Sequence, residues 1–440
     1  MTSAPTQAPL RQSPVPGFAL TLFALILTLL AYALAGIGKD GAVPANLGLY
    51  GTLVALEFFG VFLFMRKAAP HADPALFPMA AALSGIGFAV IYRLDGDLAA
   101  EQFTWLAMGL VAFLVTLAVV RDHRMLDAFT YTIGLIGIVL LLLPVLPAIG
   151  QEINGARLWV RFGPVQFQPA ELGKVFIVVF LASYLSRKRE LLSTTAWRLG
   201  PIGMPAARHL GPLLGAWGLS LIVLFAEKDL GASLLFFTVF VVMLWMATGR
   251  IAYPLIGLVL FAAGAWFAYQ AFDHVQLRVD VWLNALDPAK IYEQGYGQVA
   301  NGQFALASGG LFGTGLGEGM PFLIPGDNAG ATDFIFAAIG EELGLVGTVG
   351  VLMLLLGVVG KGFSTAVHAK DEFGKLLASG LAVLLGVQVF VIVAGVTRLI
   401  PLTGITLPFV SYGGSSLVAN FIILALIVRV SSGPAPGSLR

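Results

Sequence analysis

The chain has 440 residues, of which 58% are hydrophobic and 11% are charged, and its mean hydropathy is +0.90. Soluble domains carry about 25% charged residues, and here 25 Lys and Arg face 24 Asp and Glu, so the composition argues against a soluble enzyme, a disordered chain and a nucleic-acid-binding protein. The absence of cysteine excludes disulfides, thiolate metal sites and cysteine nucleophiles.

Apolar stretches long enough to cross a membrane recur along the whole chain. A bilayer core is crossed by about 17–25 mostly apolar residues in a helix. Residues 227–229 place three charges inside the apolar run 210–248, which is too long for one crossing, so we expect a turn there. We predict an all-α polytopic membrane protein with twelve spans: 18–37, 46–65, 75–92, 103–120, 129–147, 170–186, 210–226, 230–248, 251–271, 331–360, 374–399 and 407–429.

The distribution of Lys and Arg predicts the orientation. Basic residues concentrate in cytoplasmic loops, and most of them fall on the inner side when the N-terminus is placed inside. The first apolar run lacks a small-residue cleavage site, so we expect a retained span and not a cleaved signal peptide. Both termini are then cytoplasmic, with tails at 1–17 and 431–440 that we expect to be disordered.

Two outer segments are too long to be simple connections. They are 148–169 and 272–330, the second rich in Gly, Asp and aromatic residues. Loops longer than about 12–15 residues usually carry function. We therefore expect the chemistry of this protein on the outer face.

The first candidate pair, Glu171 and Lys174, follows Pro169 at the start of a span. Residues three apart share one face of a helix. The pair could line an outward-facing cavity, or it could be an ion pair that anchors the end of the helix. The sequence favours neither interpretation.

Asp229 lies at the same outer level, beside Glu227 and Lys228. A carboxylate with a cation nearby and apolar walls has what a general base needs, namely reach to a hydroxyl proton and a tunable pKa. The alternative is a turn whose charges are solvated.

Gly309–Gly319 contains six glycines in eleven residues but follows no strand of a βαβ unit, which argues against a nucleotide loop. A backbone nest for a lipid-linked phosphate is one interpretation, and we expect a flexible loop instead. Deeper in the chain, Glu341 and Glu342 fall within a predicted span and need a cation, for which Arg398 is a candidate. We expect a buried structural pair there.

The last predicted span begins with Ser411-Tyr412-Gly413-Gly414-Ser415-Ser416. Close helix packing is the default explanation for such small residues, and a cavity wall is the functional one. The five histidines show no metal-ligand spacing, so no dedicated zinc site is expected.

Five segments together resemble the SEDS family (shape, elongation, division and sporulation proteins, of the RodA and FtsW type). They occur in family order, and the resemblance implies a ten-span core at 75–430 preceded by an extra hairpin at 18–74. Glu227-Lys228 stand where family members commonly have Gln-Pro. The segments are Asn154–Trp159, Gln168–Lys174, Asp229–Ser233, Asp333–Gly344 and Pro408–Ser416.

The resemblance implies a peptidoglycan glycosyltransferase of the cytoplasmic membrane that polymerises lipid II at the outer face, more RodA-like than FtsW-like. It implies a class B penicillin-binding protein and other elongation or division machinery as partners. The family's essential Asp falls on Asp229, and its Glu and Lys fall on Glu171 and Lys174. Candidate contacts to pyrophosphate or glycan are Arg157, Arg161, Arg278, Lys228, Asp333, Arg398 and Ser411.

A divalent cation, Mg²⁺ or Mn²⁺, could share the charge of the pyrophosphate. Two other functions stay open. A flippase or transporter of lipid-linked precursors would also have twelve spans, but its polar groups should lie at the midplane. A non-catalytic scaffold for a penicillin-binding protein would tolerate substitution of Asp229 and Lys174.

Overall fold

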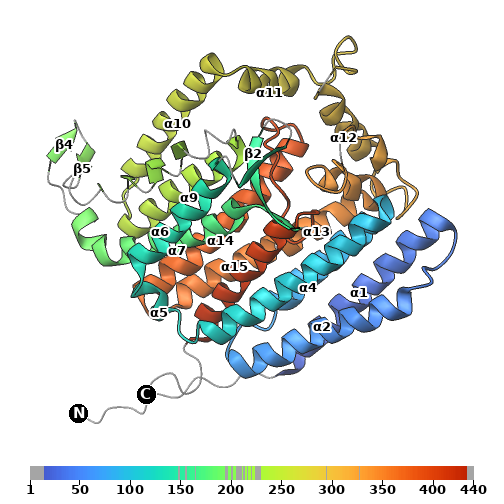
Figure 1. Ribbon diagram of the computed structural model, residues 1–440, viewed down its shortest axis with the longest axis horizontal. Helices are drawn as coiled ribbons and strands as arrows, with labels where there is room; N and C mark the ends of the chain where they lie inside the picture. Colours follow the sequence, from blue (N-terminus) through green and yellow to red (C-terminus); the bar gives the residue numbers. More distant parts are fainter. Residues whose placement is uncertain are drawn as a thin grey trace.

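The structure, a computed structural model, describes residues 14–433 except 147–148, 154–155, 164, 194–196, 200–201, 205–210, 212–213, 216, 220, 223–228, 294 and 327. Within these residues, ten helices are long and apolar enough to cross a membrane (Figure 1). They are α1 (Pro14–Asp40), α2 (Leu47–Ala68), α3 (Leu76–Leu94), α4 (Gly96–Val119), α7 (Pro169–Ser193), α9 (Leu230–Thr248), α10 (Ala252–Ala271), α13 (Ile335–His368), α14 (Glu372–Val396) and α15 (Gly414–Ser432).

These ten helices coincide with ten of the twelve predicted spans. The predicted span 129–147 corresponds to a shorter apolar helix, α6 (Thr130–Leu142), which continues into the 3₁₀ turn η1 (Leu143–Val145). The predicted span 210–226 lies largely outside the described residues, so twelve spans stay a prediction. Between α4 and α6 stands the single turn α5 (Arg124–Asp127).

The centre of the bundle is formed by α3, α7, α14 and α15, whose apolar residues are mostly buried, whereas α2 and α10 expose most of theirs. Arg429 of α15 is fully buried among them. Its guanidinium donates to the carbonyls of Ala68, Leu117 and Val120 at 2.7–2.9 Å. A buried charge is tolerated only when its donors are satisfied, and here one arginine joins the ends of α2, α4 and α15.

The outer segment predicted at 148–169 contains a small antiparallel sheet, ordered β1-β2-β3, so the all-α prediction holds for the helix bundle and is wrong for this segment. Its strands are β1 (Gly150–Ile153), β2 (Ala156–Phe162) and β3 (Val165–Phe167), and a separate hairpin joins β4 (Trp197–Leu199) to β5 (Ile202–Met204). The second outer segment holds α11 (Asp273–Asn284), α12 (Tyr296–Ser308) and the turn η2 (Pro321–Leu323). In Figure 1, α10, α11 and α12 form an arc along the upper side of the bundle.

The expectation of a flexible loop at Gly309–Gly319 is wrong, because this segment is bonded to α13. The amides of Thr314 and Gly315 donate to the carbonyls of Glu341 and Glu342 at 2.9 and 3.0 Å. The contact is made where α13 bends at Gly344, whose φ of 66° only glycine adopts readily. Bending frees helix carbonyls, and the glycine-rich segment supplies their donors.

Glu341 and Glu342 form a buried structural cluster, as expected, but the cation is not the expected one. Arg93 at the end of α3 lies 3.3 Å from Glu342, and the amide of Met320 donates to Glu341 at 2.9 Å. Arg398 instead donates to the carbonyl of Leu283, 3.3 Å away. Sequence neighbourhood suggested Arg398, whereas α3 packs beside α13 and brings Arg93 closer.

Candidate functional site

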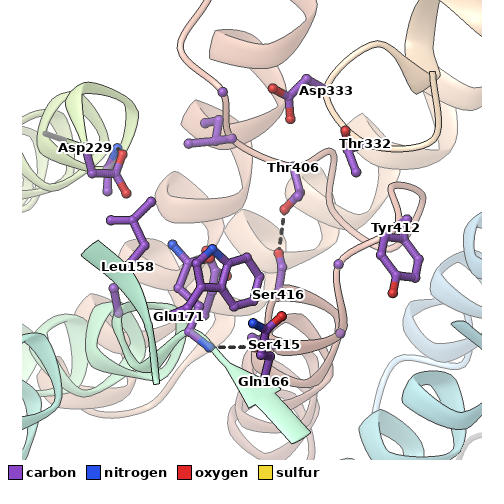
Figure 2. Close-up of a pocket in the computed structure, with 18 of the residues that line it drawn as sticks. Leu158, Gln166, Glu171, Asp229, Thr332, Asp333, Thr406, Tyr412, Ser415 and Ser416 are labelled. Carbon is purple, nitrogen blue, oxygen red and sulfur yellow. Dashed lines mark hydrogen bonds between the residues drawn. The ribbon is translucent and has the colours of Figure 1, made fainter. Parts of the chain in front are cut away.

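A cavity of about 1170 Å³ opens where the outer sheet meets the helix ends, and charged side chains from distant parts of the chain line it. Figure 2 shows Asp229 and Asp333 on different sides of this space, with Leu158 and Glu171 near the first and Tyr412 on the far side. Charged or titratable residues in its lining are Glu101, Arg161, Glu171, Lys174, Asp229, Arg278, Asp333 and Tyr412.

Glu171 and Lys174 occupy the first turns of α7, which begins at Pro169. The Lys174 ammonium lies 2.6 Å from the Glu171 carboxylate and donates to Gln388 of α14 at 3.2 Å. Lys174 is only 3% exposed. The two residues therefore form an ion pair and also line the cavity.

Asp229 caps α9 at its N-terminus, with one carboxylate oxygen 2.8 Å from the amide of Ala232. The hydroxyl of Ser233 donates to the Asp229 carbonyl at 2.7 Å, so the Asp-Leu-Gly-Ala-Ser motif builds its own cap. Burial raises the pKa of Asp229, and Glu171 raises it further. The Ala232 amide, Arg278 and Lys174 lower the same pKa. Asp229 is therefore a half-buried helix cap that lines the cavity.

Close packing explains why the motif has a glycine, Gly231, two residues after Asp229. A methyl group at Gly231 would lie 2.6 Å from the Ile405 side chain and 2.9 Å from the Thr403 carbonyl. The segment 402–405 therefore packs directly against the first turn of α9.

Replacing Gly231 with valine is expected to push segment 402–405 away from the start of α9. The rate of the reaction that the SEDS resemblance implies should then fall by at least about 10-fold, because a misplaced catalytic group loses much of its effect. The rate with purified protein is the measurement. The control is Gly48→Ala, because a methyl group at Gly48 has no atom within 4 Å, and this variant should keep the wild-type rate. Gly249 is unsuitable as a control, because its backbone φ of 69° would strain an alanine. Equal rates for Gly231→Val and Gly48→Ala would contradict the close-packing argument.

Asp333 stands just before α13, and its environment differs from that of Asp229. Burial raises its pKa to about 6, and Arg278 opposes this rise. An ideal methyl group on Gly404 would lie 3.7 Å from its carboxylate. The loop 402–405 thus packs against the α9 terminus and passes near Asp333.

The structure brings together some of the predicted contacts and separates others. Arg161 and Arg278 line the cavity, and Arg161 donates to the Gly163 carbonyl at 3.0 Å. Arg157 and Arg398 are not among the lining residues. Lys228 lies outside the described residues.

Ser411 is also absent from the lining, and it is buried. Its hydroxyl donates to the Thr332 carbonyl at 2.8 Å and accepts from the Leu407 amide at 2.9 Å. Its contacts are those of a residue that fixes the loop before α15.

Gln388 and Thr406 are among the lining residues that sequence reasoning missed. Gln388 bonds both Lys174 and the Thr406 carbonyl, the latter at 2.8 Å, and its polar side chain inside the span 374–399 was the available signal. Ser415 accepts from the Gln168 amide at 2.8 Å, and Thr406 and Ser416 are joined at 2.8 Å (Figure 2). These hydroxyls show that the small-polar start of α15 is a cavity wall as well as a packing surface.

In the part of the chain that the structure describes, no group of three or more His, Asp or Glu side chains could hold a metal ion. Asp229 and Asp333 face an arginine, and the Glu171 carboxylate is paired with Lys174. A protein-made cage for Mg²⁺ or Mn²⁺ therefore does not fit the described carboxylates, because such ions need several oxygen ligands.

Comparison with known sequences identifies the family to which this chain belongs. A family model described as "Cell cycle protein" and named for FtsW, RodA and SpoVE matches residues 74–434. The peptidoglycan glycosyltransferase RodA of Mycobacterium tuberculosis is 44% identical to this chain, over 94% of this chain and 89% of its own length. RodA of Mycobacterium leprae is 43% identical, over 93% and 88%.

Solved structures give the same fold. RodA of Thermus thermophilus is 27% identical and matches 82% of this chain and 96% of its own, with a TM-score of 0.56. A peptidoglycan synthase complex, in which polymerization and crosslinking are coordinated, contains a chain 29% identical that matches 82% of this chain and 97% of its own, with a TM-score of 0.65.

Proposed function

Because the chain belongs to the FtsW/RodA/SpoVE family, we propose that it is a peptidoglycan glycosyltransferase that joins the disaccharide units of lipid II. Undecaprenyl pyrophosphate leaves as each unit is added. The observation that carries the proposal is Asp229, a carboxylate at a helix N-terminus that faces a large cavity shared with Lys174 and Arg278.

Asp229 acts as the general base in this mechanism. It accepts the proton of the acceptor's 4-hydroxyl while that oxygen attacks the anomeric carbon of the donor. The new bond joins this oxygen to the anomeric carbon, and the bond from that carbon to the pyrophosphate oxygen breaks. Attack from the face opposite the leaving group inverts the configuration in one displacement.

Cations in the cavity then neutralise negative charge on the departing pyrophosphate. Lys174 is held by Glu171 and Gln388 and faces the cavity, and Arg161 lines it from β2. Arg157, Lys228 and Arg398 are proposed only as outlying contacts to the extended substrate. Since the described carboxylates form no cage, a divalent cation would have to arrive with the pyrophosphate, and no step of the mechanism is routed through it.

We further propose twelve spans with both termini in the cytoplasm and the cavity open to the outside of the cytoplasmic membrane. The bias of Lys and Arg supports this orientation. The hairpin α1–α2 is proposed as an addition to the family core, because the family match begins at residue 74 and the two solved structures match 82% of this chain but nearly all of their own.

The proposed partner is a class B penicillin-binding protein, within the machinery of cell elongation. Two findings support this assignment. The 44% identity is to RodA proteins, whereas an FtsW of Geobacter metallireducens is 32% identical. The matching solved complex coordinates polymerization with crosslinking.

The test is incubation of the purified protein in detergent with labelled lipid II, with and without its partner, followed by gel analysis. Glycan polymer is the expected product. Detergent removes the second compartment, so a flippase would leave lipid II unchanged. Absence of polymer under all conditions would contradict the proposed function.

A further inference from the structure

Arg278 belongs to α11 in the outer segment, yet its guanidinium reaches the cavity. Its Nη1 donates to the carbonyls of Leu402 and Thr403 at 3.3 and 3.1 Å. A second hydrogen bond holds α11 near the same segment, because the Trp282 indole donates to the Arg398 carbonyl at 3.0 Å. Arg278 is therefore fixed at its base by α11 and at its tip by the segment 402–403.

The segment 402–405 packs against the first turn of α9, which Asp229 caps, and its Gly404 lies near Asp333. The Thr403 carbonyl that Arg278 binds lies 2.9 Å from the position of a methyl group on Gly231, two residues after Asp229. The neighbouring Gly404 approaches the carboxylate of Asp333. The guanidinium thus stands where the α9 terminus, the 402–405 segment and the start of α13 converge.

Three charges from two other elements act on Asp229 at this point. Glu171 of α7 raises its pKa beyond the effect of burial, and Lys174 of α7 and Arg278 of α11 lower it. Lys174 is already paired with Glu171 at 2.6 Å, which cancels most of its field. Asp333 shares Arg278 with Asp229, and Glu101 and Arg161 line other parts of the cavity. Arg278 is thus a cation that is held by backbone carbonyls and acts electrostatically on both aspartates.

We propose that Arg278 is a positioning residue for Asp229, which places a fixed positive charge beside the carboxylate and keeps it ionised and oriented for proton transfer. The proposal rests on the proposed function. It differs from a phosphate clamp, because Nη1 of the guanidinium is held by the 402–403 carbonyls and the charge acts on the base, and not on the substrate.

The test compares the pH dependence of kcat for wild type, Arg278→Gln and Arg278→Lys with labelled lipid II. Loss of the positive charge disfavours the ionised carboxylate, so the pKa of Asp229 rises and the acidic limb moves to higher pH. A neighbouring opposite charge shifts an Asp by about one to three units, so we expect Arg278→Gln to raise the midpoint by about one unit. Arg278→Lys retains the charge and should keep the midpoint near that of wild type.

Two further variants test the direction of the shift in the acidic midpoint and its specificity for Arg278. Glu171→Gln removes a negative charge and should move the acidic limb to lower pH, opposite to Arg278→Gln. Arg161→Gln is the matched control, since Arg161 is a cavity arginine that also binds a backbone carbonyl but is absent from the groups that act on Asp229. Its acidic midpoint should stay at the wild-type value.

The outcomes separate this inference from the proposed function. A wild-type protein that makes no polymer would refute the function itself. A wild-type protein that polymerises, with an Arg278→Gln variant whose KM rises while its acidic midpoint stays unchanged, would overturn the positioning role and favour a phosphate clamp. Equal shifts in Arg278→Gln and Arg161→Gln would also overturn it.

Discussion

Asp229→Asn is expected to lower the rate of glycan polymerisation by about 10²–10⁴-fold, the usual effect of losing a general base. The fold should survive, because asparagine is as good an N-cap as aspartate and its side-chain oxygen can accept from the Ala232 amide. The loss would therefore reflect the missing proton acceptor. The measurement is the initial rate of polymer formation from labelled lipid II by purified protein.

The matched control is Asp97→Asn, which changes an exposed aspartate in the first turn of α4, away from the cavity lining. We expect it to polymerise at the wild-type rate. Thermal unfolding of both variants in detergent should resemble that of wild type. Near-normal polymer from well-folded Asp229→Asn would remove Asp229 from the mechanism.

The second large effect is expected at Lys174, where stability and activity can be separated. Lys174→Met leaves the Glu171 carboxylate without its cation. Breaking a buried ion pair in this way lowers the free energy of unfolding by about 3–5 kcal/mol. The variant should unfold several degrees below wild type. It should also lose most activity, because the cation that faces the pyrophosphate is gone and the pKa of Asp229 rises.

The double variant Glu171→Gln with Lys174→Met distinguishes the two roles of the pair. Removing both charges relieves the unpaired carboxylate, so much of the lost stability should return. Polymerisation should stay low, because the cation is still absent. Recovery of activity together with stability would mean that the pair only anchors α7, and the catalytic part of the assignment would fail.

The cavity also explains why the motifs of this chain are short and scattered. Asp229 needs Gly231 so that segment 402–405 can approach, and that segment in turn receives Arg278 from α11. The backbone amide of Gln168 donates a hydrogen bond to the Ser415 hydroxyl, which fixes the end of the sheet against the start of α15. Each motif supplies one wall, and no single motif contains the site.

The amino-acid sequence by itself determined the membrane class, the position of ten apolar helices, the family and the identity of Asp229, Glu171 and Lys174 as candidates. These follow from local properties, since a run of apolar residues and a proline before two charges need no distant partner to be recognised. Only the tertiary structure decided that Arg93, and not Arg398, neutralises Glu342, and that Gly309–Gly319 is bonded to the bend of α13. It also decided that Gln388 belongs to the site and that Arg278 is held by the segment 402–403. Such pairings depend on which helices pack side by side, and residues far apart in the chain carry no local signal of the partner that folding brings to them.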